Sequence, residues 1–268
     1  MAGPDPHLLD LLSRRITAAA AHHAGLLVIG ICGAQGSGKS TLVAALAARL
    51  GEQGTVCAVL SLDDLYLMRA ERAQLGRDVH PLLATRGVPG THDVALGLAV
   101  IAALKRGEPV KLPRFDKGRD DRAPEADWPC APPKCQVLLF EGWCAGAAPQ
   151  PASALARPVN ALEEREDPDL IWRSYANAAL AGPYQALFAR IDLLILLAAP
   201  GWEVVARWRE EQEQVLRTAA APRAMDPPEI ARFIQHYERL TRWILEELPG
   251  RADITVRLGP HREVIGTG

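Results

Sequence analysis

The amino-acid sequence predicts an α/β fold in which a mainly parallel, five-stranded sheet lies between two layers of helices. Two observations support this three-layer α/β/α sandwich. Five short apolar runs alternate with longer segments of helical pattern, and a glycine-rich loop joins the first run to the helix after it. A chain of 268 residues with 49% hydrophobic side chains can fill one such core. No linker or repeat divides the sequence, so we expect a single domain over residues 1–268.

The first elements of the chain predict a nucleotide site. Residues 7–23 have the amphipathic pattern of an N-terminal helix, and residues 26–31 form the first apolar strand. The strand leads into a stretch that fits G-x-x-x-x-G-K-[ST], in which glycines let backbone N–H groups point at a phosphate. The expected nucleotide-binding residues are those of this loop: Gly33, Ala34, Gln35, Gly36, Ser37, Gly38, Lys39, Ser40 and Thr41.

Two loop side chains carry most of the expected chemistry. We expect Lys39 to reach the β- and γ-phosphates and the Ser40 hydroxyl to ligate Mg²⁺. The alanine- and leucine-rich segment after the loop predicts a helix that ends near Gly51 or Gly54, as this motif requires. The sequence therefore predicts a P-loop NTPase fold that binds ATP with Mg²⁺.

The second strand, residues 55–62, ends in two carboxylates, Asp63 and Asp64. Parallel strands present their carboxyl ends to one edge of the sheet, so both should face the phosphate loop. Phosphoryl transfer needs a group that takes the proton of the acceptor hydroxyl. Asp63 is the candidate for this base and for a metal contact, with Asp64 as second choice for either role. A plain helix cap is the alternative for both.

Two charged stretches between residues 64 and 134 predict the acceptor pocket. Residues 66–91 break into polar and turn residues, and a helix then runs from Asp93 to about Lys105. Residues 113–122 form a second, densely charged loop. Long loops in a compact domain tend to be functional, and these basic side chains suit an anionic substrate, with plain surface charge as the alternative.

The third strand, residues 135–140, ends in Glu141. A carboxylate in this place can act through the metal or on the acceptor, and a solvated strand end is the alternative. Residues 169–188 predict a helix that is interrupted at Gly182-Pro183, and residues 191–197 predict the fourth strand.

Residues 202–222 predict a small lid over the γ-phosphate. The helical part carries Arg207 and Arg209, which could stabilise the charge of the transferred group in the transition state. Glutamates follow at a spacing of three and four residues, so surface ion pairs are the alternative for both arginines.

The last two elements complete the expected sheet. Residues 226–248 predict a helix whose aromatic side chains have the spacing of a core face: Phe233, Tyr237 and Trp243. Residues 252–258 predict the fifth strand.

Composition excludes several other classes of protein. A net charge of -2 argues against a nucleic-acid binder, and no apolar run approaches the ~20 residues of a membrane helix. The N-terminus lacks the apolar region of a signal peptide, so we expect a cytoplasmic location. The five cysteines lack metal-ligand spacing and are expected to be free thiols. Nothing in the sequence indicates an obligate protein partner.

Four stretches resemble the D-glycerate 3-kinase family, in the wider group of uridine kinase, phosphoribulokinase and pantothenate kinase. They are SLDDLY at residues 61–66, RGVPGTHD at residues 86–93, PRFDK at residues 113–117 and FEGW at residues 140–143. The resemblance extends over residues 26–258, and the second and third stretches are far more specific than the phosphate loop.

The resemblance implies that ATP and D-glycerate react to give ADP and 3-phosphoglycerate. Asp63 matches the base of the wider group and Glu141 matches its strand-end acid. The resemblance also implies a set of substrate-binding residues: Asp64, Tyr66, Arg86, His92, Asp93, Arg114, Asp116 and Lys117. Guanidinium and ammonium groups pair well with the carboxylate of a small hydroxy acid.

Two other readings stay open at this point. A kinase of the same fold could act on a nucleoside, pantothenate or a sugar phosphate. A GTP-binding switch or an ATPase coupled to a partner is a different class, although no Asn-Lys-x-Asp stretch follows the fourth strand to read guanine.

Overall fold

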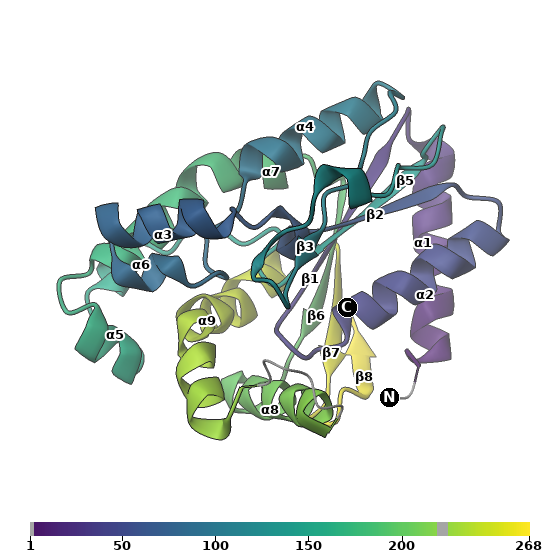
Figure 1. Cartoon of the computed structure of the whole chain (residues 1–268). Helices are drawn as coiled ribbons and strands as arrows, with labels where there is room; N and C mark the ends of the chain where they lie inside the picture. Colours follow the sequence, from purple (N-terminus) through teal and green to yellow (C-terminus); the bar gives the residue numbers. More distant parts are fainter. Residues whose placement is uncertain (1–2, 219–224) are drawn as a thin grey trace.

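The computed structural model describes residues 3–218 and 225–268, and a six-stranded sheet runs through it in the order β2-β5-β1-β6-β7-β8 (Figure 1). Five strands are parallel, and the edge strand β8 is antiparallel to β7. Their bounds are β1 Leu27–Gly33, β2 Cys57–Ser61, β5 Val137–Gly142, β6 Leu193–Ala198, β7 Ile254–Leu258 and β8 Val264–Thr267.

Helices cover both faces of the sheet. In Figure 1, α1 and α2 lie on one side and α4, α7 and α9 on the other, which confirms the predicted three layers. The α-helices are α1 Pro6–His22, α2 Lys39–Glu52, α3 Arg69–Asp78, α4 Val94–Lys105, α5 Ala161–Glu166, α6 Ile171–Ala179, α7 Gln185–Phe188, α8 Trp202–Thr218 and α9 Pro227–Glu247. Within the described ranges no helix is long and apolar enough to cross a membrane.

Short elements complete the chain. A two-stranded hairpin, β3 Phe115–Asp116 with β4 Asp121–Arg122, lies outside the main sheet. The 3₁₀ turns are η1 Leu62–Leu65, η2 Pro81–Ala84, η3 Glu125–Asp127, η4 Ala152–Leu155 and η6 Leu248–Gly250. A π-helical turn, η5 Leu180–Tyr184, joins α6 to α7 and contains Pro183, so the predicted interruption of this helix is confirmed.

The structure corrects the prediction in two places and leaves part of it untested. The sheet has a sixth strand, β8. The sequence prediction missed this strand because it has only four residues and is only partly buried. The stretch 66–91 was expected to be loop and contains α3, a largely polar helix without an apolar stripe. Of the expected lid, residues 219–222 lie outside the described residues.

The core explains why the sequence forms this sheet. Every residue of β1 and β5 is buried, as expected for parallel strands covered on both faces. The strand order places the carboxyl ends of β1, β2 and β5 side by side. The residues that follow these three ends are the phosphate loop, Asp63 and the segment after Glu141.

Candidate active site

The phosphate loop lies between β1 and α2, as predicted. Gly36 and Gly38 have positive φ angles of 77° and 88°, which only glycine adopts without strain. A Cβ atom on Gly36 would lie 2.6 Å from Cβ of Trp208, so α8 packs directly on the loop. Lys39 Nζ donates a hydrogen bond to the carbonyl oxygen of Ala34 at 3.2 Å, which folds this ammonium group over the loop.

A cluster of oxygen atoms lies beside the loop. The Ser40 hydroxyl donates to Glu141 Oε1 at 3.2 Å, and the Ser61 hydroxyl donates to the same atom at 2.8 Å. Glu141 is only 7% exposed. Hydroxyl and carboxylate oxygens are the ligands that Mg²⁺ prefers, so Ser40 and Glu141 fit this ion. Ser61, which the sequence prediction did not include, connects Glu141 to the backbone N–H of Asp63 at 3.2 Å.

Asp63 follows β2 and contacts the loop of residues 113–117. Its carboxylate accepts hydrogen bonds from Lys117 Nζ at 2.7 Å and from the Tyr66 hydroxyl at 3.0 Å. Burial raises the pKa of Asp63, but the ammonium groups of Lys117 and Lys39 outweigh it and lower the pKa to about 2. The carboxylate is therefore ionised at neutral pH, as a proton acceptor must be.

Asp64 is turned to the other charged loop. It accepts a hydrogen bond from the Phe115 backbone N–H at 3.0 Å and forms an ion pair with Arg114 at 3.2 Å. Burial raises the pKa of Asp64 despite these two partners. The contacts attach the loop of residues 113–117 to η1, so Asp64 positions the segment that brings Lys117 to Asp63.

Tyr66 and His92 form the buried wall of the site. Their rings stack with centroids 4.5 Å apart, and the two side chains are 3% and 5% exposed. Burial lowers the pKa of His92 to about 3, so its imidazole is neutral at neutral pH.

Three other expected substrate residues have partners within the protein. Arg86 forms an ion pair with Asp120 and lies over the Phe115 ring at 5.6 Å. Asp93 caps α4 and pairs with Arg122 at 3.1 Å. The Asp116 carboxylate accepts from the backbone of its own turn, at residues 118 and 119. The carboxylates of Asp93 and Asp116 therefore hold the shape of the loops, and Arg86 is paired with Asp120.

The two arginines of α8 point to different places. Arg207 donates to the carbonyl oxygen of Pro260 at 3.2 Å, away from Asp63. Arg209 lies over the Phe233 ring at 5.4 Å. The Phe233 ring packs against Tyr237 with centroids 5.2 Å apart, so Arg209 lies on the same side of α9 as Tyr237.

Tyr237 is a site residue that the sequence did not reveal. Its helical spacing predicted a core position, and it is 2% exposed, but its hydroxyl donates to the carbonyl oxygen of Arg86 at 3.1 Å. A Cβ atom on Gly87 would lie 2.1 Å from that hydroxyl oxygen, so the glycine of the RGVPGTHD stretch is required for this approach. Trp143 Nε1 donates to the Gly87 carbonyl at 3.0 Å. No local pattern indicates contacts between residues this far apart in sequence.

A cavity of about 520 Å³ flanks the phosphate loop on the side away from Asp63. Its lining includes Ser37, Gly38 and Thr41 of the loop and residues 258 and 261–264 of the C-terminal segment. Arg262 closes one side, since it donates to the Gly36 carbonyl at 2.6 Å and lies over the Trp208 ring at 5.1 Å.

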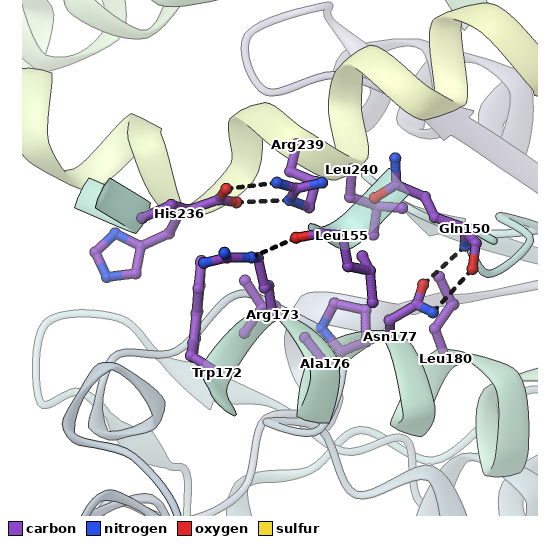
Figure 2. A pocket seen from close by; sticks show the side chains of 13 residues that line it. Gln150, Leu155, Trp172, Arg173, Ala176, Asn177, Leu180, His236, Arg239 and Leu240 are labelled. Carbon is purple, nitrogen blue, oxygen red and sulfur yellow. Dashed lines mark hydrogen bonds and ion pairs between the residues drawn. The ribbon is translucent and has the colours of Figure 1, made fainter. Parts of the chain in front are cut away.

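A cluster of buried ion pairs lies next to residues 86–93. Side chains from α6 and α9 lie around a small cavity (Figure 2), whose volume is about 40 Å³ and which Val88 and Pro89 also line. Arg239 binds Glu163 at 2.6 Å, and Arg173 binds Asp167 at 2.9 Å. The cluster holds α5, α6 and α9 together beneath the RGVPGTHD stretch.

Comparisons with known proteins agree with this geometry. The model of a family described as methylmalonyl Co-A mutase-associated GTPase MeaB matches residues 7–67, which contain the phosphate loop and Asp63. The chain is 36% identical over 244 residues to the uncharacterized kinase mug58 of Schizosaccharomyces pombe, which covers 87% of this chain and 85% of the relative.

Two further relatives are D-glycerate 3-kinases. The chloroplastic enzyme of Arabidopsis thaliana is 35% identical over 222 residues, 79% of this chain and 46% of that protein, so the chain spans about half of its length. A solved structure of the enzyme from Cryptococcus neoformans has the same fold, with a TM-score of 0.83, 24% identity and coverage of 98% and 99% of the two chains. The chain therefore belongs to the family of ATP-dependent P-loop kinases that contains D-glycerate 3-kinase.

Proposed function

We propose that this kinase transfers the γ-phosphoryl group of ATP to the C3 hydroxyl of D-glycerate, giving ADP and 3-phosphoglycerate. The observation that carries the proposal is the place of Asp63, an ionised carboxylate whose pKa both Lys39 of the phosphate loop and Lys117 of the acceptor loop depress. The named substrate of the Arabidopsis relative supports the choice of acceptor.

Each group has a role in this reaction. The phosphate loop and Lys39 hold the triphosphate, and Ser40 and Glu141 hold Mg²⁺, which when bound neutralises charge on the phosphate oxygens. Asp63 takes the proton of the C3 hydroxyl as its oxygen bonds to the γ-phosphorus and the bond to ADP breaks. Lys117 and Arg86 provide cations for the glycerate carboxylate.

Lys117 has to give way for this reaction to proceed. Its ammonium group lies 2.7 Å from Asp63, and its side chain is 61% exposed. Because this ammonium group is accessible, the carboxylate of an incoming hydroxy acid can reach it and compete with Asp63 for it. Lys117 then pairs with the substrate, and Asp63 is left to bind the hydroxyl.

We place the nucleoside of ATP in the cavity of about 520 Å³ beside the phosphate loop. The cavity adjoins Ser37, Gly38 and Thr41, so a nucleotide with its phosphates on the loop can extend into it. Its volume suits a ligand of nucleoside size. Arg262, which contacts Gly36, lies in its wall.

A nucleotide hydrolase is the second candidate, favoured by the match of residues 7–67 to a GTPase family. That match ends at residue 67, before the acceptor loops. The cations of residues 86–117 suit an anionic acceptor, which a kinase binds in addition to the nucleotide.

The test is a coupled ADP-release assay with MgATP and a panel of acceptors: D-glycerate, L-glycerate, uridine, pantothenate, ribulose 5-phosphate and none. Release that depends on D-glycerate supports the proposal. Release with another acceptor would replace the substrate but keep the kinase mechanism. Release without any acceptor, unchanged by the panel, would favour the hydrolase.

A further inference from the structure

Tyr184 lies behind the acceptor site, in the π-helical turn that joins α6 to α7. Its side chain is 1% exposed. The hydroxyl oxygen accepts a hydrogen bond from the Gly90 backbone N–H at 2.9 Å and lies 2.6 Å from Nδ1 of His92. π-Helical turns inside helices often occur at functional sites.

The proton positions in this contact follow from the donors available. The Gly90 N–H can only donate, so the Tyr184 oxygen is the acceptor there. Burial raises the pKa of Tyr184 well above its usual value, so the hydroxyl keeps its own proton. Within the described residues, His92 Nδ1 is the acceptor that this proton reaches. Nδ1 therefore carries no proton, and the neutral imidazole carries its proton on Nε2.

The Nε2–H group of His92 is a hydrogen-bond donor that the described residues leave unpaired. It is buried and has no hydrogen-bond partner among the described residues. Leaving a buried donor unpaired costs free energy, so such a group is expected to have a ligand. His92 stacks on Tyr66, whose hydroxyl donates to Asp63. The free donor is thus close to the proposed base.

We propose that Tyr184 is a positioning residue that fixes His92 as the Nε2–H tautomer, and that this N–H donates a hydrogen bond to an oxygen atom of the bound acceptor. The inference rests on the proposed function only in placing the acceptor beside Asp63. A fixed neutral donor holds the oxygen without adding positive charge next to Lys117. It also disfavours compounds that lack an oxygen in this place, because the donor then stays unpaired.

The first experiment determines the tautomer directly. Long-range ¹H–¹⁵N NMR of protein labelled with ¹⁵N-histidine distinguishes Nε2–H from Nδ1–H by the shifts of the two ring nitrogens, and His92→Gln identifies the His92 signals. We expect a single Nε2–H tautomer in the wild type and loss of this preference in Tyr184→Phe. An Nδ1–H tautomer or an imidazolium in the wild type at pH 7 would overturn the inference, whatever the substrate is.

The second experiment separates positioning from folding. Tyr184→Phe should raise the KM for the acceptor about tenfold and leave the KM for ATP unchanged. Tyr175→Phe is the matched control, because ring carbons of Tyr175 pack on the same Gly90 turn, and both KM values should stay as in the wild type. Equal rises in both KM values for Tyr184→Phe, or none, would contradict the inference.

Two substitutions of His92 test the donor atom. The amide nitrogen of Gln can take the place of Nε2, whereas that of Asn takes the place of Nδ1, so His92→Gln should keep a lower acceptor KM than His92→Asn. The reverse order would contradict the assignment. If another acceptor replaces D-glycerate in the panel, the proposed substrate fails, and the same KM measurements with that acceptor still decide the inference.

Discussion

The phosphate loop takes its shape mainly from its own backbone, with Arg262 as a distant contact to the Gly36 carbonyl, whereas several charged pairs between distant parts of the chain hold the loops on the acceptor side. The loop needs positive φ angles at Gly36 and Gly38, which are properties of single residues. The acceptor side depends on pairs such as Arg72 with Asp120, 48 positions apart, and Arg239 with Glu163, 76 positions apart.

We call the phosphate loop of residues 33–41 the nucleotide half of the site, and residues 64–134 with the helices packed on them the acceptor half. The two halves differ in which substitutions should damage them. Backbone N–H groups bind phosphate in any chain that forms the loop, so phosphate binding depends on few side chains outside the loop, chiefly Trp208 and Arg262 at Gly36.

The acceptor half depends on ion pairs, of which Arg239 with Glu163 and Arg173 with Asp167 are buried, and the loss of one partner of a buried pair leaves a charge without compensation. Asp63 lies between the two halves in the sequence, follows β2 of the sheet and pairs with Lys117 of the acceptor loop.

The largest effect on activity is expected where the two halves meet. Asp63→Asn removes the proton acceptor and should lower kcat by ~10²–10⁴-fold, the usual range for a general base. The phosphate loop does not depend on this carboxylate, so the affinity for MgATP should stay as in the wild type. Steady-state kinetics and nucleotide titration measure the two quantities. Near-normal turnover would show that Asp63 is not the base.

The buried ion pairs of the acceptor half should dominate its stability. Arg239→Ala leaves Glu163, which is fully buried, without its cation, and should cost about 3–5 kcal/mol in the free energy of unfolding. Arg232→Ala is the matched control, because Arg232 also joins α9 to α5, through Glu166, but at the surface. Its cost should be below about 1 kcal/mol. Equal costs in denaturant unfolding would refute the comparison.

The two arginines of α8 are expected to differ in their effect on kcat. Arg209→Ala should lower kcat by about 10²-fold if this side chain stabilises the transferred group. Arg207→Ala should have a smaller effect on kcat, because Arg207 is engaged by the carbonyl of Pro260. Parallel measurements of kcat and nucleotide affinity test this order, and a larger loss for Arg207→Ala would reverse the assignment.

The smallest expected effect is a change in pH dependence. Because Lys117 and its neighbours lower the pKa of Asp63 to about 2, the free wild-type enzyme should lose kcat/KM through this group only as the pH falls toward that value. Lys117→Gln removes the first of the lowering charges while burial still raises the pKa. The acidic limb of kcat/KM should therefore move to higher pH.

Lys117→Arg keeps the positive charge and serves as the control for this shift. Its acidic limb should stay close to that of the wild type. Identical limbs in Lys117→Gln and the wild type would mean that Lys117 does not set the ionisation of Asp63.

The nucleotide half could be predicted from the sequence because its signals are local. The apolar runs predicted the five parallel strands, and the spacing of the glycines predicted the phosphate loop. The prediction failed for β8, a short edge strand, and for α3, a polar helix that buries Arg72 rather than an apolar stripe. Neither element has a periodicity that the sequence alone could reveal.

The acceptor half was predicted as a set of residues but not as an arrangement. Short stretches pointed to His92 and Lys117, and the contacts of these two residues depend on tertiary structure. Tyr184 lies 92 positions from its partner His92, and Tyr237 lies 151 positions from Arg86. In the sequence both tyrosines resemble ordinary core residues. Only the contacts of their hydroxyl groups in the structure distinguish them from such residues.

The most direct test of the proposed function is to identify the product by ³¹P NMR after incubation with MgATP and D-glycerate. We expect 3-phosphoglycerate in an amount equal to that of ADP, because the proposed reaction transfers the γ-phosphoryl group to the C3 hydroxyl. Inorganic phosphate in place of a phosphate ester, or 2-phosphoglycerate, would contradict it.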